Sequence, residues 1–202
     1  MKSNIEPIQT ETFYHIYNRG INGENIFKQP ENYSYFLHKY SALIPNIADT
    51  YAYCLLRNHF HFLIKTKTDI EIQQAFSKKN KTSTSLISLQ FSHLFNGYTQ
   101  AINKSINRTG GLFETPFRRK EINEEVYLRQ LILYIHFNPE KHGLCNDFRN
   151  YEFSSYQAFL SKKSTKLKKI EVLEWFSDIE DFKQFHSDLG NLHKDILEFN
   201  NH

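Results

Sequence analysis

Two histidines separated by one phenylalanine, His59 and His61, have the type and spacing of metal ligands. The segment HFHFLIK (59–65) is predicted to be a β-strand, and residues i and i+2 of a strand point to the same face. Both imidazoles would then emerge side by side, while Phe60 and Phe62 pack on the opposite face. Such a pair suits two ligands on one metal ion. The alternative is a pair of surface histidines on a half-exposed strand.

A tyrosine and an asparagine about 70 residues later could complete such a site. Tyr134 and Asn138 are four residues apart in a predicted helix and share one face of it, with Tyr127 and Gln130 roughly on that face. A tyrosine hydroxyl can attack a phosphodiester, and a metal ion can polarise the phosphate. Two imidazoles and one amide oxygen leave positions for phosphate oxygens, which suits Mg²⁺ or Mn²⁺. Alternatively, Tyr134 is a core aromatic and Asn138 ends the helix before Pro139.

The sequence lacks the other residues that histidine-based zinc enzymes require. No cysteine neighbours the histidine pair and no HExxH segment is present, so a zinc protease or deaminase is not supported. Cys54 and Cys145 are far apart and form no CxxC motif, which argues against structural zinc and a disulfide scaffold. The sequence has neither an apolar run of 18 residues nor a signal-peptide core. We therefore expect a cytoplasmic protein.

The elements that must position these residues alternate between strands and helices. Strands are predicted over residues 12–18, 50–56 and 59–65, and over LFETPFRRKEI (112–122), where Pro116 indicates an edge or a bulge. Helices are predicted over residues 30–44, 69–79, 83–104 and 124–137, with Asp69 and Asn123 as N-caps. This order indicates an α+β fold with a mainly antiparallel sheet.

The net charge of +3 is distributed unevenly along the chain. Residues 1–169 carry a net charge of +9, whereas residues 170–202, predicted to form one or two short amphipathic helices, carry −6. A basic body suggests a polyanionic partner. We divide the chain into a domain over 1–160 and a basic linker with an acidic helical appendage over 161–202. The appendage is either a packing element or an intramolecular cover for the basic body that competes with its polyanionic partner.

Aromatic residues are abundant, with 18 Phe and 12 Tyr among 202 residues. Such side chains usually fill cores, although a surface for single-stranded nucleic acid also uses them. The hydrophobic fraction of 40% and the charged fraction of 23% are ordinary for a globular protein. The length suits one domain with a small appendage.

Five blocks resemble, in order and spacing, the REP-associated tyrosine transposases of the single-tyrosine HUH superfamily. They are YHIYNRGINGENIF (14–27), YAYCLLRNHFHFLIK (51–65), GGLFETPFRRKEI (110–122), YLRQLILYIHFNPEKHGL (127–144) and YEFSSYQAFL (151–160). The HFH triplet alone is weakly specific, but together with YIHFNP it is a strong signal. The resemblance covers roughly residues 12–160.

The resemblance implies a ferredoxin-like (RRM-like) antiparallel sheet flanked by helices. It also implies cleavage and rejoining of single-stranded DNA near hairpins, with a divalent metal and a 5′-phosphotyrosine intermediate but no ATP. By motif position, His59 and His61 match the metal-binding histidines, Tyr134 the nucleophile and Asn138 the residue that completes the metal site. His136 points about 200° away from Tyr134 around the helix and is not assigned.

Basic residues are candidates for contacts to single-stranded or hairpin DNA. We select Arg19, Arg57, Arg108, Arg118, Arg119 and Lys120, with Lys65, Lys78, Lys79 and Lys81 as further candidates. The run Arg118-Arg119-Lys120 is the best cluster, because it leads to the helix that carries the tyrosine. For each of these residues the alternative is a solvated surface charge.

Four functions follow from these features, of which a metal-dependent transposase that cleaves single-stranded DNA is favoured. A domesticated regulator that binds DNA hairpins without cutting them is the main alternative. A replication or conjugation endonuclease of the HUH type usually has a longer chain and does not fit the YIHFNP block. An RNA-binding RRM-like module would need no metal ion at its sheet. Both a monomer and a homodimer remain open.

Overall fold

The computed structural model describes residues 7–77 and 79–188 of the chain. The expectations for Lys78 and for residues 189–202, the last part of the predicted C-terminal helices, lie outside the described residues. Within the described ranges, no helix is both long enough and apolar enough to cross a membrane.

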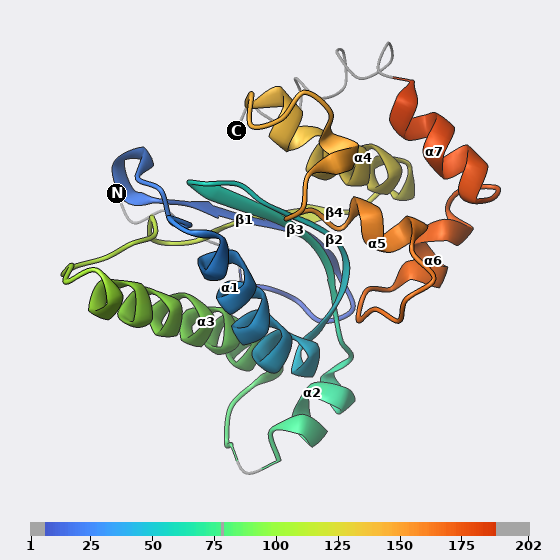
Figure 1. The fold of residues 1–202 in the computed structure, drawn as a ribbon. Helices are drawn as coiled ribbons and strands as arrows, with labels where there is room; N and C mark the ends of the chain where they lie inside the picture. The colour runs from blue at the N-terminus through green and yellow to red at the C-terminus, as the bar shows by residue number, and fades with distance from the viewer. Residues whose placement is uncertain (1–6, 78, 189–202) are drawn as a thin grey trace.

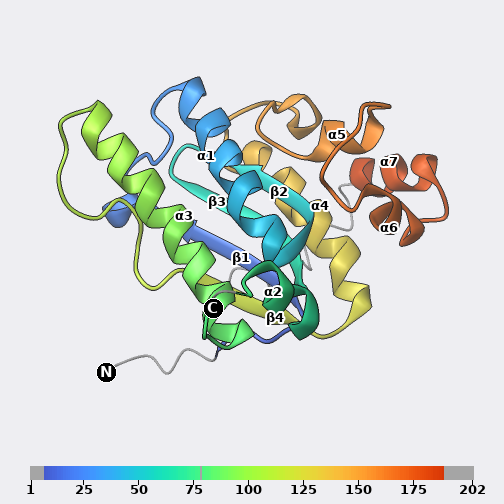
Figure 2. The ribbon, with the colours of Figure 1, turned by 90° about the horizontal axis from the view of Figure 1, so that it is seen from below.

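A four-stranded antiparallel sheet lies at the centre of the molecule (Figures 1 and 2). Its strands are β1 (Phe13–Arg19), β2 (Ala48–Leu55), β3 (His59–Thr66) and β4 (Arg118–Ile122), in the order β2-β3-β1-β4. Helix α1 (Pro30–Leu43) connects β1 to β2, while α2 (Asp69–Ala75) and α3 (Ser83–Ser105) connect β3 to β4. This βαββαβ order with β1 and β3 in the middle is ferredoxin-like. The predicted fold class is confirmed.

Helices cover both faces of the sheet (Figure 1). Helices α1 and α3 lie on one face, and α4 (Glu125–Lys141) lies on the other, beside α5 (Tyr156–Leu160), α6 (Lys169–Glu174) and α7 (Ile179–Ser187). Single 3-10 turns, η1 (Ile21–Gly23), η2 (Ile44–Asn46) and η3 (Phe148–Asn150), lie in the connections.

The sheet separates two hydrophobic cores, because successive side chains of a strand point to opposite faces. Phe60 and Phe62, each 1% exposed, pack with α1 and α3 on the face opposite to the histidine pair, as predicted. Leu63 packs with α4 in the second core. That core also contains Val172 of α6 and Phe182 of α7, so the described part of the C-terminal segment packs together with α4. The boundary at residue 160 stays a prediction.

Both predicted N-caps are corrected by one residue. Thr68 caps α2 instead of Asp69: its hydroxyl accepts a hydrogen bond from Glu71 N at 3.2 Å, and the Glu71 carboxylate accepts one from Thr68 N at 3.0 Å. This capping box satisfies two backbone donors, whereas an Asp69 cap would have satisfied one. Glu124 is the N-cap of α4 instead of Asn123, and its side chain makes no capping hydrogen bond.

The predicted strand over LFETPFRRKEI is regular only from Arg118 onward. Phe113 forms an isolated bridge with Gly20, and the Thr115–Pro116 peptide bond is cis. Because proline has no N–H to donate to a ladder, continuous pairing with β1 begins only after it. The expected disturbance at the proline is therefore confirmed, and β4 is shorter than predicted.

Helix α4 continues through Pro139 to Lys141 instead of ending at residue 137. Proline removes one backbone N–H from the helix, but the following turn still closes, with His142 N donating to Asn138 O at 3.0 Å. The side chain of Asn138 also donates from Nδ2 to Tyr134 O at 2.7 Å. Asn138 consequently lies inside the helix, and His142, the C-cap residue, lies one turn after Asn138.

A chain of buried hydrogen bonds anchors the outer side of α4. His136 Nδ1 lies 2.9 Å from His186 Nε2, and His136 Nε2 lies 2.8 Å from Ser155 Oγ. His186 Nδ1 donates to Phe182 O at 2.8 Å, so its Nε2 must accept from His136. His136 therefore accepts from the Ser155 hydroxyl. This chain holds α4 against α5 and α7, on the side of α4 away from Tyr134.

Stability should fall in mild acid, because His186 is buried in its neutral form. Burial lowers the pKa of His186 from 6.5 to about 4. Between these two pH values the unfolded chain takes up a proton that the folded chain cannot accept, so stability present above pH 6.5 is lost as the pH falls toward 4. We expect His186 to contribute up to ~3 kcal/mol to this loss. Urea unfolding over this pH range measures it.

Two variants isolate the contribution of His186. In His186→Gln the amide can keep both hydrogen bonds but does not titrate, so the pH dependence of the unfolding free energy should become shallower. His38→Gln changes an exposed histidine on α1 and should leave the dependence unchanged. An equally steep dependence in His186→Gln would contradict this account.

Candidate active site

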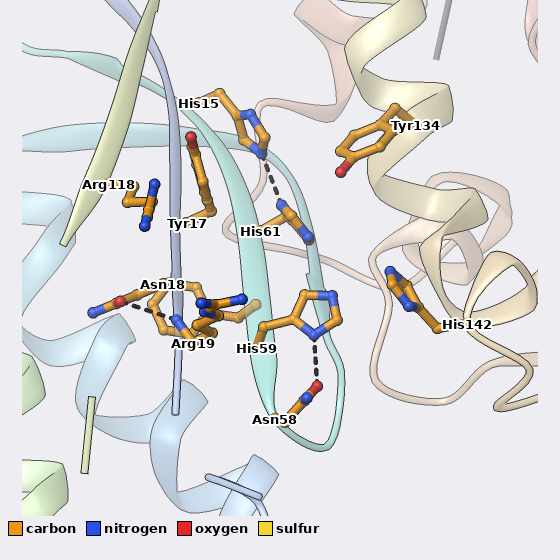
Figure 3. A pocket seen from close by; sticks show the side chains of 11 residues that line it. His15, Tyr17, Asn18, Arg19, Asn58, His59, His61, Arg118, Tyr134 and His142 are labelled. Atoms are coloured by element: carbon orange, nitrogen blue, oxygen red, sulfur yellow. Dashed lines mark hydrogen bonds between the residues drawn. The ribbon is translucent and has the colours of Figure 1, made fainter. Parts of the chain in front are cut away.

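A cavity of about 380 Å³ lies between the sheet and α4 (Figure 3). It is lined by His15, Tyr17, Asn18, Arg19, Asn58, His59, Phe60, His61, Arg118, Tyr134 and His142. The structure thus brings together the two predicted metal ligands, the predicted nucleophile and two of the predicted DNA-binding arginines. The remaining predicted ligand, Asn138, lies one helical turn from Tyr134 on the same face of α4.

Strand β3 presents both histidines of the HFH triplet on the face covered by α4. Their ring centroids are 5.2 Å apart and the ring planes are nearly perpendicular. His61 pairs with Tyr17 of β1 and Cys54 of β2 in the ladder, so it is enclosed in the sheet and only 5% exposed. His59 begins the strand and is partly exposed.

A hydrogen bond at Nδ1 orients each of these imidazoles (Figure 3). Asn58 Oδ1 lies 2.7 Å from His59 Nδ1, and His15 Nε2 lies 2.9 Å from His61 Nδ1. Because a carbonyl oxygen can only accept, neutral His59 carries its proton on Nδ1 and keeps the lone pair on Nε2. Nδ1 is thus occupied in both rings, and the Nε2 atoms are left for other partners.

Helix α4 supplies the opposite wall of the cavity. Tyr134 is 5% exposed, and its ring meets the rings of His15 and His61 edge-on, at centroid distances of 6.0 and 5.4 Å. Asn138 is fully buried, and its Oδ1 atom has no hydrogen-bond partner. The same is true of His61 Nε2. Two buried polar atoms without partners at one site require an explanation, because such groups are normally satisfied.

The donor set differs from the common metal-site pattern. In the described part of the chain, no three His, Cys, Asp or Glu side chains come together to hold a metal ion. The candidate set here is two imidazoles and one amide oxygen, which is neutral and includes a hard oxygen ligand.

The imidazoles of the cavity are held in their neutral form. Burial lowers the pKa of His59 to about 4, with a further lowering by the neighbouring His142 and Arg19 and a small opposite effect of the Asn138 amide. Burial likewise lowers the pKa of His61 and His15, which face each other. Neutral imidazole is the form that binds a metal ion.

The tyrosine hydroxyl is also held in its neutral form. Burial raises the pKa of Tyr134 above its usual value, the amide of Asn138 lowers it, and the nearby Tyr17 adds a small increase. Asn138 therefore influences both Tyr134 and His59. Deprotonation of Tyr134 during an attack would need assistance from a cation or a base.

One carboxylate joins the two arginines at the edge of the cavity. Glu114 forms ion pairs with Arg19 and with Arg118, the latter at 3.5 Å. The arginine side chains are 61% and 51% exposed, so these pairs are weak but hold both guanidinium groups at the same place.

The other predicted DNA-binding residues are distributed over several surfaces. Arg119 points to the opposite face of the sheet, where its guanidinium lies 5.5 Å from the Phe117 ring centroid. Lys120 pairs with His15 in the ladder and shares the face of Arg118. Arg108 forms an ion pair with Glu24, and Arg57 lines a second cavity. Because side chains alternate along β4, Arg118 and Lys120 lie on one face of the sheet and Arg119 on the other.

Sequence reasoning missed His15, Asn58 and His142 as parts of the site. His142 lies eight residues, or about two helical turns, after Tyr134. Helical spacing would have predicted it on the same face if the helix had been extended beyond Pro139. Asn58 precedes the HFH triplet directly in the turn. His15 depends on the register between β1 and β3, which no local pattern reveals.

In a comparison with solved structures, the chain is similar to a REP-associated tyrosine transposase bound to a REP hairpin. The TM-score is 0.60 at 15% sequence identity, and the match covers 80% of this chain and 86% of that chain. The chain therefore shares the fold of that transposase, and the resemblance stated from the sequence is confirmed at the level of the fold. No protein family and no curated protein gives a match to the sequence.

The tautomer of His59 is a direct test of this geometry. At neutral pH we expect ¹⁵N-detected NMR to show a neutral ring with the proton on Nδ1, and this state should persist below pH 6, because the pKa is lowered to about 4. Asn58→Ala removes the acceptor and should shift the population toward the Nε2–H form. A predominant Nε2–H form in the unmodified protein would contradict the assigned hydrogen bond.

Proposed function

We propose that this chain is a metal-dependent transposase that cleaves and rejoins single-stranded DNA at hairpin-associated sites through a 5′-phosphotyrosine intermediate. The observation that carries the proposal is the shared cavity of a buried tyrosine and two neutral imidazoles whose Nδ1 atoms are already engaged. The similarity to a transposase bound to a REP hairpin supports a nucleic-acid hairpin as the class of partner.

His59, His61 and Asn138 fit a divalent metal ion such as Mg²⁺ or Mn²⁺. The fit rests on the unpartnered Nε2 of His61 and Oδ1 of Asn138 and on the Nε2 lone pair that the Nδ1–H tautomer leaves on His59. For His61 to use Nε2 as a ligand, its Nδ1 must carry the proton and donate to His15 Nε2. When bound, such an ion supplies positive charge that stabilises the phosphate during displacement.

Tyr134 is the proposed nucleophile of the cleavage step. Its Oη atom attacks the scissile phosphorus, the bond from phosphorus to the 3′ oxygen breaks, and the phosphate stays on the tyrosine through its 5′ side. The phenolic proton leaves Tyr134 as the bond forms, and the departing 3′ oxygen takes up a proton. A 3′-OH later attacks the phosphotyrosine and releases Tyr134, so no nucleotide cofactor is required.

Cations around the cavity are proposed to position the DNA backbone. Arg19 and Arg118 lie at the cavity itself and are the first choice for phosphates next to the cleaved bond. Arg57, Arg108, Arg119 and Lys120 do not line this cavity and are proposed to contact DNA outside it. The ion pairs of Glu114 with Arg19 and Arg118 would give way to stronger contacts with phosphate.

Loss of the Tyr134 hydroxyl should abolish the covalent intermediate. We expect a labelled hairpin DNA with single-stranded flanks to form a denaturant-resistant adduct with the protein in Mn²⁺, and Tyr134→Phe to form none. Denaturing gel electrophoresis measures the adduct, and peptide mass spectrometry locates it.

Tyr17→Phe is the matched control, because Tyr17 is the other tyrosine that lines the cavity. This variant should keep the adduct on Tyr134. An equal yield in Tyr134→Phe would exclude Tyr134 as the nucleophile. Binding of the hairpin without any adduct in the unmodified protein would instead favour a DNA-binding regulator.

His15 should influence metal affinity through its hydrogen bond to His61. We expect His15→Leu to weaken Mn²⁺ binding by ~10- to 100-fold in the absence of DNA, measured by isothermal titration calorimetry. His15→Gln keeps an amide oxygen that can accept from His61 Nδ1 and should retain most of the affinity. Equal affinities in all three proteins would show that His15 does not orient the ligand.

A further inference from the structure

A second cavity lies on the other side of the β2–β3 turn from the candidate active site. Its volume is about 390 Å³. Asn58 and His59 line the first cavity, whereas the preceding residue, Arg57, lines the second. At the end of α4, His142 lines the first cavity and Leu144 the second. The two cavities thus share the turn and the end of α4 as their common border.

The floor of the second cavity is aromatic. Tyr33 lies between Phe27 and Phe153 in a stack with centroid distances of 4.4 and 3.8 Å, and Tyr151 meets Phe153 edge-on at 5.9 Å. Phe27 and Tyr33 are buried, whereas Tyr151 and Phe153 are partly exposed. Partly exposed rings beside a hollow of this size can receive a planar ligand.

The rim of the second cavity is polar and positively charged. Arg57 and Lys28 provide the cations, while Asn25 and Gln29 provide amide groups. None of the residues that line this cavity is acidic. Among the residues that the structure describes, neither Arg57 nor Lys28 forms an ion pair with a carboxylate. These cations therefore need no rearrangement to meet an anionic ligand.

Backbone hydrogen bonds hold the border between the two cavities in place. Arg57 O accepts from both Ile26 N and Phe27 N, at 2.8 and 2.9 Å, and Asn58 O accepts from Gly20 N at 2.8 Å. The turn that carries Arg57 is thereby tied to the loop before α1 and to the end of β1. A ligand in the second cavity would have a fixed position relative to His59.

We propose that the second cavity binds one unpaired nucleotide of the same DNA strand, close to the cleaved phosphate. Its base lies on the aromatic floor, and its phosphate lies between Arg57 and Lys28. A single strand is the occupant that matches aromatic rings and cations side by side, and it can continue directly from the first cavity. The inference rests on the proposed function, because the first cavity must hold the adjoining part of the strand.

Two substitutions test the cavity at residues that do not line the candidate active site. Leu144→Trp fills the second cavity, and Arg57→Gln removes one of its cations. Ser41→Trp is the matched control for volume, because Ser41 lines a separate cavity between α1 and β2. Lys104→Gln, at an exposed position in the last turn of α3, is the matched control for charge.

The probe is the hairpin with single-stranded flanks that the unmodified protein enriches from a randomised pool. Fluorescence anisotropy then compares this hairpin with versions that carry one abasic site at each flank position in turn. We expect one abasic position to weaken binding to the unmodified protein by about tenfold. The same abasic site should have no effect in Leu144→Trp but its full effect in Ser41→Trp. Arg57→Gln should reduce the salt slope of binding by roughly 0.7, and Lys104→Gln should not.

The outcomes separate the two proposals. Suppose that every abasic site weakens binding equally in Leu144→Trp and in the unmodified protein, while the hairpin still binds and forms the Tyr134 adduct. The second cavity then does not hold a nucleotide, and the proposed function stands. If the protein enriches no hairpin at all, both proposals are wrong. If Leu144→Trp changes the effect of every abasic position by the same amount, the second cavity does not hold one defined nucleotide, which would also overturn the inference.

Discussion

The packing of α4 on the sheet is the contact on which the candidate active site depends. The histidine pair belongs to β3, whereas the tyrosine and the asparagine belong to a helix that follows 59 residues after the end of that strand. Buried residues such as Leu131 and Ile135 hold α4 against the sheet, and the hydrogen bonds of His136 hold its opposite side. With both sides of α4 fixed, Tyr134 has little freedom relative to His61. The C-terminal helices contribute to the site through this support and not through direct contact with the cavity.

The chemistry of the site follows from neutral groups in the centre and charged groups at the edge. Burial keeps the imidazoles and the tyrosine uncharged. The three proposed ligand atoms therefore contribute no formal charge against a divalent cation, so the balancing charge would come from the phosphate of the substrate. Arg19 and Arg118 lie outside this centre, where solvent weakens their ion pairs with Glu114, so both guanidinium groups would be available to the phosphates of the proposed DNA substrate.

Sequence patterns predicted those parts of the site that depend on one element at a time. Alternation along a strand placed His59 and His61 on one face, and helical spacing placed Tyr134 and Asn138 together. The contribution of His15 could not be predicted in this way, because it depends on the pairing of β1 with β3, which brings together two residues 46 positions apart in the chain. Strand alternation also places Arg119 on the face opposite to Arg118 and Lys120, so the run 118–120 does not form one patch on a single face. The fold class was predictable because strand alternation and helical spacing reveal the order of strands and helices along the chain.

Two imidazoles and one amide are proposed to form a metal site next to Tyr134. Anomalous X-ray diffraction from crystals soaked in MnCl₂ tests it most directly, because the position of the ion is then observed independently of activity. The account predicts one strong peak in contact with Nε2 of His59, Nε2 of His61 and Oδ1 of Asn138, and loss of that peak in His61→Ala. A peak at another position with none at these atoms would contradict the account.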